Sequence, residues 1–411
     1  MPPSSAPAIA TAILALTLAR LGDWGGVSMR TAVRLPLGDP PPASLPAYTP
    51  LDRAALAASS LRAATTQWAD AIAGPESFAF GPDGTLYTGS ANGTVWAVAG
   101  APPGGRLTPP TPRPLAHTGG RPLGLAWDPT HARLLVACSV KGLLAVDPQT
   151  GRVSLLASFA SQAGHGGHSP GPGLVCLANS VTPLAPGVGG AGRAGGALFT
   201  TSMDTPPPPP RVPGGWWQPV EAAQAALFSG VPTGRLLRYD EASGVTSAIA
   251  GGLWFANGVV TVDGGDAALV AETFGGRLVR VGLVGEGEGV VTPFSNLPGC
   301  PDGVALDPSP ARPPAAGVAH GEAPPAGFAR ALAGSKAARW LVSRLPAAVL
   351  AGGTPPVGLA VRVSTADGSI LETRADAGGR VVRGVTSAVV GPDGRLYLGS
   401  LGGAGVQSVA V

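Results

Sequence analysis

Short apolar runs separated by turn-forming residues dominate the chain. In the segment that starts at Gly81 (GPDGTLYTGS), a Pro-Asp-Gly turn leads into a short apolar run and a small polar pair. The segment that starts at Gly391 (GPDGRLYLGS) repeats this order almost residue for residue. Apolar runs of this length, bounded by glycine, proline and aspartate, are typical of β-strands, whereas helices need longer stretches with a 3.6-residue period. The pattern therefore predicts an all-β protein.

Related units lie between these two segments. In each unit, two apolar strands are joined by a glycine-containing turn; the units begin at Asp128, at Gly195 (with its second segment from Gly234) and at Asp263. Repeats built only from short strands are typical of propeller blades. Division of the span Gly74–Val411 into about six parts gives roughly 56 residues for each, slightly more than an ordinary blade. Five blades are clear, and a degenerate sixth is expected within Asp302–Glu372. The sequence predicts a six-bladed β-propeller with Pro/Gly-rich loop insertions and an N-terminal extension.

The domain boundaries follow from the same pattern. Residues 1–50 are expected to be a leader and linker, residues 51–73 an extended or helical arm, and residues 74–411 the propeller. A short helix is expected within Leu51–Ala73. The arm is also expected to supply an outer strand that closes the ring, because an open propeller would leave an exposed strand edge.

Proline-rich insertions account for the extra length of the blades. They are Pro206–Pro213 and Pro308–Pro325. The second is followed by the alanine-rich stretch Ala326–Leu350, which contains Trp340 and is expected to form a short helix over one face of the propeller.

An uncharged apolar run, Ala6–Ala19, lies near the N-terminus and ends at Arg20. It is short for a membrane span but has the length of a signal-peptide core, although the positive segment that usually precedes such a core is missing. A signal peptide or anchor and a disordered alanine-rich leader are the alternatives.

Composition and charge exclude some classes of protein. The hydrophobic fraction of 45% with only 12% charged residues is ample for a large core and unlike intrinsic disorder. The net charge of +3 carries no Lys/Arg cluster, so nucleic acid is not an expected partner. Cys138, Cys176 and Cys300 show no metal-binding spacing and are expected to be buried free thiols.

Candidate chemistry lies at one position of the repeat. When the units are aligned on their turns, the position about six residues upstream starts the innermost strand of each blade. In chain order it reads Glu76, Leu123, Asn179, Asn257, Asp302 and Thr386–Ser387. Innermost strands line the central channel of a propeller, so equivalent positions lie at similar depth around its axis. The oxygens of Glu76, Asn179, Asn257 and Asp302 form a hard donor set that suits one Ca²⁺ ion. Leu123, Thr386 and Ser387 are expected to line the same channel.

Each of the four has a simpler interpretation taken alone. Asn257-Gly258 is a hairpin-turn signal and Pro301-Asp302-Gly303 a turn signature. Glu76 could be a solvated turn residue and Asn179 a capping residue. Their shared position in the repeat favours the metal site, because true turns such as Pro82-Asp83-Gly84 occupy a different phase.

A family resemblance rests on several stretches in order. They are GPESFAFGPDGTLYTGSANGTVWAV, GRPLGLAWD, KGLLAVDPQTG, GRLLRYDEASG, LWFANGVV, ALVAETFGGRLVRV, LPGCPDGVALD, TPPVGLAVRV and DGRLYLGSL. In these the chain resembles the strictosidine synthase-like family, including the adipocyte plasma membrane-associated proteins. The resemblance implies a six-bladed propeller and entry into the endomembrane or secretory pathway (endoplasmic reticulum, vacuole, extracellular or membrane-anchored). Membrane association is expected through the N-terminus only.

The chain departs from strictosidine synthase at the catalytic position. That enzyme joins an amine and an aldehyde by Pictet–Spengler condensation with one glutamate as acid/base. The matching place here is Ser387 or a neighbour in VTSAVVGPDG, and a serine cannot act as this acid/base at neutral pH. Gly120 also replaces a disulfide cysteine of the plant enzymes, and Thr201 an aspartate common in relatives. Strictosidine synthesis is therefore not expected.

Paraoxonases and gluconolactonases share the propeller and bind calcium through Glu, Asn, Asn and Asp. Glu76, Asn179, Asn257 and Asp302 resemble that set. The resemblance implies a Ca²⁺-dependent arylesterase- or lactonase-like hydrolase with Asp302 and Glu76 as catalytic residues. Its expected substrate is a small ester, lactone or other apolar molecule. The alternatives are a Pictet–Spengler amine–aldehyde condensing enzyme and a non-catalytic propeller binding module in which the ion only holds the inner strands.

Overall fold

A computed structural model of the chain describes residues 48–100, 111–163, 172–188, 194–204, 219–309, 312–321, 332–342 and 357–411. The apolar run Ala6–Ala19 lies outside these residues, as does Pro206–Pro213. Within the described ranges no helix is long and apolar enough to cross a membrane.

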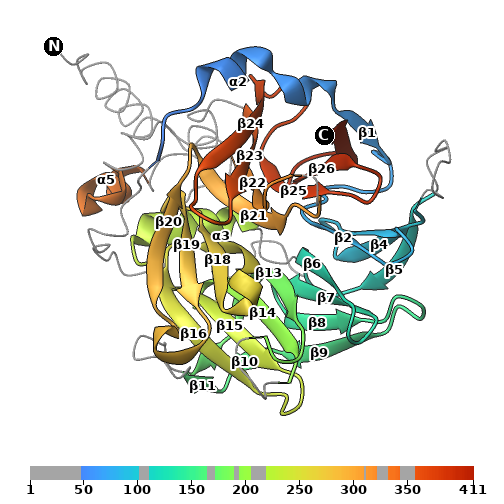
Figure 1. The fold of residues 1–411 in the computed structure, drawn as a ribbon, viewed down its shortest axis with the longest axis vertical. Helices are drawn as coiled ribbons and strands as arrows, with labels where there is room; N and C mark the ends of the chain where they lie inside the picture. The colour runs from blue at the N-terminus through green and yellow to red at the C-terminus, as the bar shows by residue number, and fades with distance from the viewer. Residues whose placement is uncertain are drawn as a thin grey trace, which may run out of the picture.

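Six antiparallel sheets are arranged as blades around a central axis (Figure 1). Blade 1 consists of β2 (Phe78–Phe80), β3 (Leu86–Gly89), β4 (Thr94–Val98) and β5 (Arg113–His117). Blade 2 consists of β6 (Pro122–Asp128), β7 (Arg133–Cys138), β8 (Gly142–Val146) and β9 (Val153–Ala157). Blade 3 consists of β13 (Cys176–Leu184), β14 (Gly196–Met203), β15 (Gly234–Asp240) and β16 (Thr246–Leu253), with β11 (Gln162–Ala163) added parallel to β16.

The remaining blades follow the same order. Blade 4 consists of β17 (Ala256–Val262), β18 (Ala267–Glu272), β19 (Arg277–Gly282) and β20 (Val291–Asn296). Blade 5 consists of β21 (Cys300–Leu306), β22 (Ala315–Gly321), β23 (Val357–Ser364) and β24 (Ile370–Ala377). Blade 6 consists of β25 (Val385–Val390), β26 (Arg395–Ser400), β27 (Val406–Ala410) and β1 (Thr65–Gln67). A small extra sheet pairs β10 (Phe159–Ala160) with β12 (Gly173–Leu174).

The predicted six-bladed propeller is confirmed, with one correction. Blade 5, which was expected to be degenerate, is a regular four-stranded sheet. The pairing of β22 with β23 has no register shift, and the pairs β21–β22 and β23–β24 each contain one bulge. The stretch Pro308–Pro325, predicted to be an insertion, contains β22, and its proline-rich composition hid this strand in the sequence.

The N-terminal arm closes the ring. β1 pairs antiparallel with β27, with Thr65 opposite Ser408, so the last blade combines strands from both ends of the described chain. This confirms the predicted closing strand. The arm also contains the expected short helix, α2 (Arg53–Ala58), where the Asp52 side chain accepts hydrogen bonds from two backbone N–H groups of the first turn. A 3₁₀ turn, Ser60–Ala63, leads from it to β1.

Helices α3 and α5 lie in connections between second and third strands. α3 (Pro219–Ser229) lies between β14 and β15, and α5 (Lys336–Val342) lies between β22 and β23. α5 confirms the helix expected in the alanine-rich stretch and contacts α3. α3 itself was not predicted. Its Ala222 and Ala226 pack against Leu123 and Leu177, which lie on the innermost strands of blades 2 and 3.

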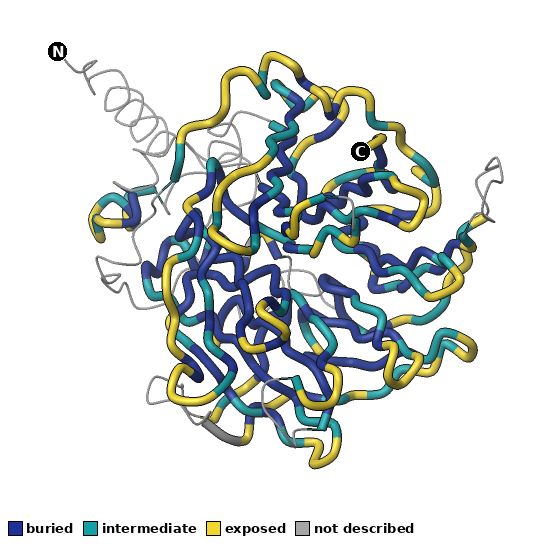
Figure 2. The backbone as a smooth tube through the Cα atoms, in the orientation of Figure 1, coloured by how far each residue is buried: buried dark blue, intermediate teal, exposed yellow. Residues whose placement is uncertain are grey.

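The hydrophobic core is divided among the blade interfaces. Each pair of neighbouring blades encloses its own cluster of buried side chains, and the buried segments lie within the blades while turns at the rim are exposed (Figure 2). All three cysteines are buried and free, as expected. Because the cores lie between the sheets, the axis itself is left for other side chains.

Candidate metal centre

The predicted site residues occupy a break in the register of each innermost strand. In blades 2 to 6 the pairing with the second strand shifts at this position, between Pro122 and Gly124, Ala178 and Val181, Ala256 and Val259, Pro301 and Val304, and Val385 and Ser387. In blade 1, Glu76 lies two residues before the start of β2. A bulge leaves a residue unpaired and re-aims its side chain. The positions aligned in the sequence are therefore equivalent in the structure as well.

This placement excludes the turn interpretation of the two Asx-Gly pairs. Asn257-Gly258 lies inside β17, and Asp302-Gly303 lies inside β21. A Cβ atom at Gly258 would lie 2.2 Å from the backbone nitrogen of Val304, and one at Gly303 would lie 2.5 Å from the backbone oxygen of Thr386. Glycine is required because the backbone of the next blade passes too close for a side chain.

The simpler interpretations of the other two residues are also wrong. Glu76 is only 5% exposed, so it is not a solvated turn residue. Asn179 lies within β13, and its Nδ2 donates to Ser202 Oγ at 2.9 Å, so it caps no helix.

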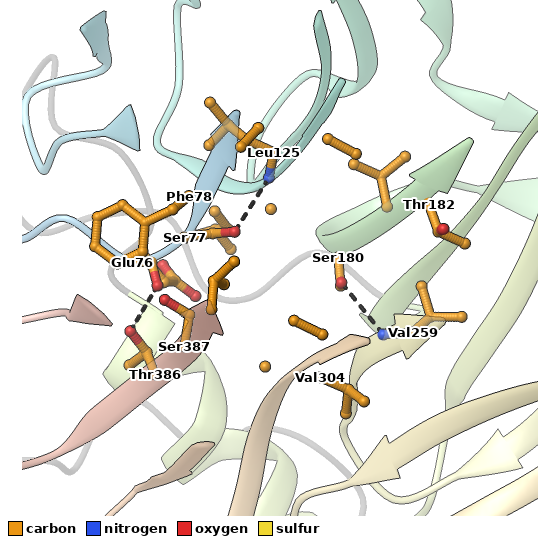
Figure 3. A pocket seen from close by; sticks show the side chains of 18 of the residues that line it. Glu76, Ser77, Phe78, Leu125, Ser180, Thr182, Val259, Val304, Thr386 and Ser387 are labelled. Atoms are coloured by element: carbon orange, nitrogen blue, oxygen red, sulfur yellow. Dashed lines mark hydrogen bonds between the residues drawn. The ribbon is translucent and has the colours of Figure 1, made fainter. Parts of the chain in front are cut away.

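All seven predicted residues line one cavity of about 230 Å³ between the six innermost strands. In Figure 3 the side chains of Glu76, Ser77 and Ser387 lie beside one another, and Thr386 Oγ1 donates to the backbone oxygen of Glu76 at 2.9 Å. Across the cavity, Ser180 Oγ accepts from the backbone N–H of Val259 (Figure 3). The structure thus brings the predicted residues together around a common space.

The two carboxyl groups are under electrostatic stress. Burial raises the pKa of Glu76 to about 7, although the positive charge of Arg121 lowers it in part. Burial also raises the pKa of Asp302 well above its usual range; the charge of Glu76 adds to this rise, and a hydrogen bond from the Asn257 side chain opposes it. The carboxyl groups are therefore close enough to repel one another, and a divalent cation between them would remove that repulsion.

Arg121 is a feature that the sequence analysis missed. Its Nε lies 4.0 Å from Glu76 Oε2, and its terminal nitrogen donates to the backbone oxygens of Gly74 and Leu401. The guanidinium joins blades 1, 2 and 6 where the ring closes. Its only signal in the sequence is its place in GRPLGLAWD just before Leu123, which does not reveal that it turns toward Glu76.

The residues present fit a calcium ion. Two carboxylates and two amides supply oxygen donors only, which is what Ca²⁺ prefers. Glu76 Oε2 is buried and accepts no hydrogen bond from any described residue, an arrangement that needs a compensating partner. No group of three or more His, Cys, Asp or Glu side chains with metal-binding potential occurs in the described ranges.

Known proteins resemble this chain in fold and in sequence. The fold is that of solved propellers such as a gluconolactonase from Xanthomonas campestris, at 15% identity and a TM-score of 0.53 over 93% of this chain and 99% of that chain. A calcium-binding protein, regucalcin from Agrobacterium tumefaciens, matches at 14% identity and a TM-score of 0.50 over 83% and 90%. At these identities the likeness shows the fold alone.

Sequence relatives define the family resemblance more closely. Residues 59–98 match the family described as "Strictosidine synthase-like, N-terminal", and residues 218–285 match "Strictosidine synthase". Strictosidine synthase-like protein 10 of Arabidopsis thaliana is 28% identical over 80% of this chain and 83% of its own length. The adipocyte plasma membrane-associated protein of Salmo salar is 31% identical over 59% of this chain, and the match spans about half (53%) of that relative. By sequence the chain is similar to strictosidine synthase-like proteins, and its fold is a six-bladed β-propeller.

Proposed function

We propose that this propeller is a Ca²⁺-dependent hydrolase of small esters or lactones. The observation that carries the proposal is the set of four oxygen-bearing side chains at equivalent positions around one cavity, among which Glu76 Oε2 is buried without a hydrogen-bond partner in the described residues. The names of the fold neighbours, a gluconolactonase and a calcium-binding protein, agree with this choice of chemistry.

Each residue would have a distinct role. Glu76, Asn179, Asn257 and Asp302 would hold the ion. A bound Ca²⁺ would polarise the substrate carbonyl and stabilise the charge that develops on its oxygen. Asp302, which keeps some exposure to the cavity, would take the proton from the attacking water. Leu123, Val259 and Val304 supply apolar lining that favours an apolar ester.

The test is an assay of phenyl acetate and simple lactones after chelation and after restoration of Ca²⁺. Glu76→Gln and Asp302→Asn should each lower Ca²⁺-dependent turnover by about 100-fold or more, because each removes a ligand charge. Glu272→Gln is the matched control: Glu272 is a buried carboxylate of blade 4 that pairs with Arg277 and does not line the cavity. Absence of turnover in both metal states, or turnover unchanged in Glu76→Gln and Asp302→Asn, would reject the proposal.

A second candidate is an amine–aldehyde condensing enzyme. It is favoured by the raised pKa of Glu76, about 7, and by the position of this carboxyl beside Ser387, where the family's glutamate is absent. A Pictet–Spengler product from tryptamine and an aldehyde, lost in Glu76→Gln, would support it. A large Ca²⁺-dependent rise in melting temperature without turnover on either substrate panel would instead indicate a non-catalytic propeller.

Entry into the endomembrane or secretory pathway through the N-terminus stays a prediction, tested by fractionation of cells that express the full chain.

A further inference from the structure

We propose that Ser202 and Thr273 are positioning residues that hold the side-chain amides of Asn179 and Asn257 with their oxygens toward the cavity. The inference rests on the proposed metal site. It concerns Ser202 in the second strand of blade 3 and Thr273 directly after the second strand of blade 4, positions that the alignment of innermost strands did not consider.

The first contact joins blades 3 and 4. Ser202 Oγ donates its hydrogen to the backbone oxygen of Ala256 at 2.9 Å, and Asn179 Nδ2 lies 2.9 Å from the same Oγ. A serine hydroxyl has a single hydrogen. Because a carbonyl oxygen can only accept, that hydrogen is committed to Ala256, and the hydroxyl offers the amide only lone pairs. The amide must therefore present its nitrogen to Ser202, which leaves Asn179 Oδ1 for the cavity.

The same arrangement recurs one blade further on. Thr273 Oγ1 donates to the backbone oxygen of Pro301 at 2.8 Å and accepts from Asn257 Nδ2 at 3.5 Å. The Asn257 amide nitrogen thus has Thr273 Oγ1 as an acceptor, and its Oδ1 is the end that remains for a cation.

These contacts connect three predicted ligands in sequence around the ring. Ala256 directly precedes Asn257, and Pro301 directly precedes Asp302. Each hydroxyl therefore fixes the amide of one blade and the backbone beside the ligand of the next. Ser202 and Thr273 are buried, so water does not readily replace either hydroxyl. Without the hydroxyl an amide can rotate and present N–H groups toward the ion, which opposes binding.

Thr200 provides a matched control in the same strand as Ser202. Its Oγ1 donates to the backbone oxygen of Asn257 at 2.6 Å and accepts from the backbone N–H of Ser180 at 3.1 Å. It joins blades 3 and 4 as Ser202 does, but no bond connects it to an asparagine amide. Its loss should weaken the blade interface and leave the ligands oriented.

The experiment is calorimetric titration of Ca²⁺ into chelator-stripped protein, with thermal unfolding of the metal-free forms measured in parallel. Ser202→Ala and Thr273→Val should each weaken Ca²⁺ affinity by about 10-fold, the scale expected when a ligand loses its orienting partner. Thr200→Val should lower the melting temperature of the metal-free protein about as much as Ser202→Ala does. Its Ca²⁺ affinity should nevertheless stay within about twofold of wild type. Thr273→Ser keeps the hydroxyl and should restore affinity.

The outcomes separate this inference from the proposed function. Normal Ca²⁺ binding in wild type, with unchanged affinity in folded Ser202→Ala and Thr273→Val, would overturn the positioning role alone. An equal loss of affinity in Thr200→Val would also overturn it, because the effect would then follow interface stability. A wild-type protein that binds no Ca²⁺ would overturn the metal site, and the positioning role with it.

Discussion

The two sides of the central cavity differ in how their polar groups are satisfied. On the side of blades 3 to 5, buried hydroxyls bond Asn179 and Asn257, and Asn257 in turn bonds Asp302. On the side of blades 6 and 1, Glu76 Oε2 and Ser387 Oγ are buried and have no hydrogen-bond partner among the described residues. Both sides are made from equivalent strand positions, so the difference comes from the side chains and not from the fold.

This difference indicates a separate role in ligand binding for each side of the cavity. A hydrogen-bonded network holds its members in one geometry, which suits the orientation of ligands. A buried polar atom without a partner destabilises the fold by about 1–3 kcal/mol, so it persists where a bound species compensates for it. Blades 3 to 5 are therefore the pre-arranged side, and blades 6 and 1 are the side at which an ion or substrate would complete the structure.

The largest expected effect comes from adding a side chain between blades 4 and 5, on the pre-arranged side of the cavity. Gly258→Ala would place a Cβ atom 2.2 Å from the backbone nitrogen of Val304, so blades 4 and 5 must separate. We expect a loss of about 3 kcal/mol or more in the free energy of unfolding, measured by urea denaturation. Gly402→Ala is the control, since nothing lies within 4 Å of its Cβ position, and it should change stability by less than about 0.5 kcal/mol. Equal stability of the two variants would show that blades 4 and 5 accommodate the added methyl group.

A smaller effect is expected from His320, a buried group of blade 5 that no hydroxyl holds. Neither ring nitrogen has a hydrogen-bond partner in the described ranges, and burial lowers the pKa of His320 from 6.5 to about 3. Because the folded-state pKa is lower than that of the unfolded chain, only the unfolded chain gains a proton as pH falls from 6.5 toward 3. Stability is therefore full above pH 6.5 and falls with acidification.

His320→Leu should remove this acid sensitivity. At pH 5, wild type should lose about 2 kcal/mol of unfolding free energy, relative to its value at pH 7.5, that the variant does not lose. Urea denaturation at both pH values measures the difference. The same pH dependence in both proteins would mean that the His320 ring gains a partner or water in solution.

The smallest effect is expected at Arg121, on the side of blades 6 and 1. Arg121→Met removes a positive charge 4.0 Å from Glu76 Oε2, so Ca²⁺ affinity should rise by about 10-fold. The titration is best made at pH 8, because Arg121 lowers the pKa of Glu76 and its loss lets a proton compete for this carboxylate. The melting temperature of the metal-free protein should fall as the bonds to Gly74 and Leu401 are lost.

Arg277→Met is the control for that change. Arg277 pairs with Glu272 at 2.6 Å away from the cavity, so its loss should affect stability without affecting Ca²⁺ affinity. Weaker Ca²⁺ binding in Arg121→Met would contradict the prediction and would mean that the guanidinium orients Glu76 for the ion.

The architecture and the candidate ligand positions could be predicted from the amino-acid sequence alone. Strand length, turn residues and the repeat are local properties, so they could be read without coordinates, and equivalent places in a repeat become equivalent places around the axis. This is why Glu76, Asn179, Asn257 and Asp302 could be aligned in advance, and why the closing strand in the arm could be expected.

The surroundings of those positions could not be predicted, because they depend on how the blades pack against one another. Glycines 258 and 303 read locally as turn residues, but close approach of the next blade explains them. Arg121 meets Glu76 and Leu401, and Thr273 meets Pro301, across blade boundaries that no local pattern encodes. α3 follows a Pro-rich stretch, and its contact with Leu123 joins segments almost 100 residues apart in the chain. Such contacts depend on ring closure, which brings together residues that are distant in sequence.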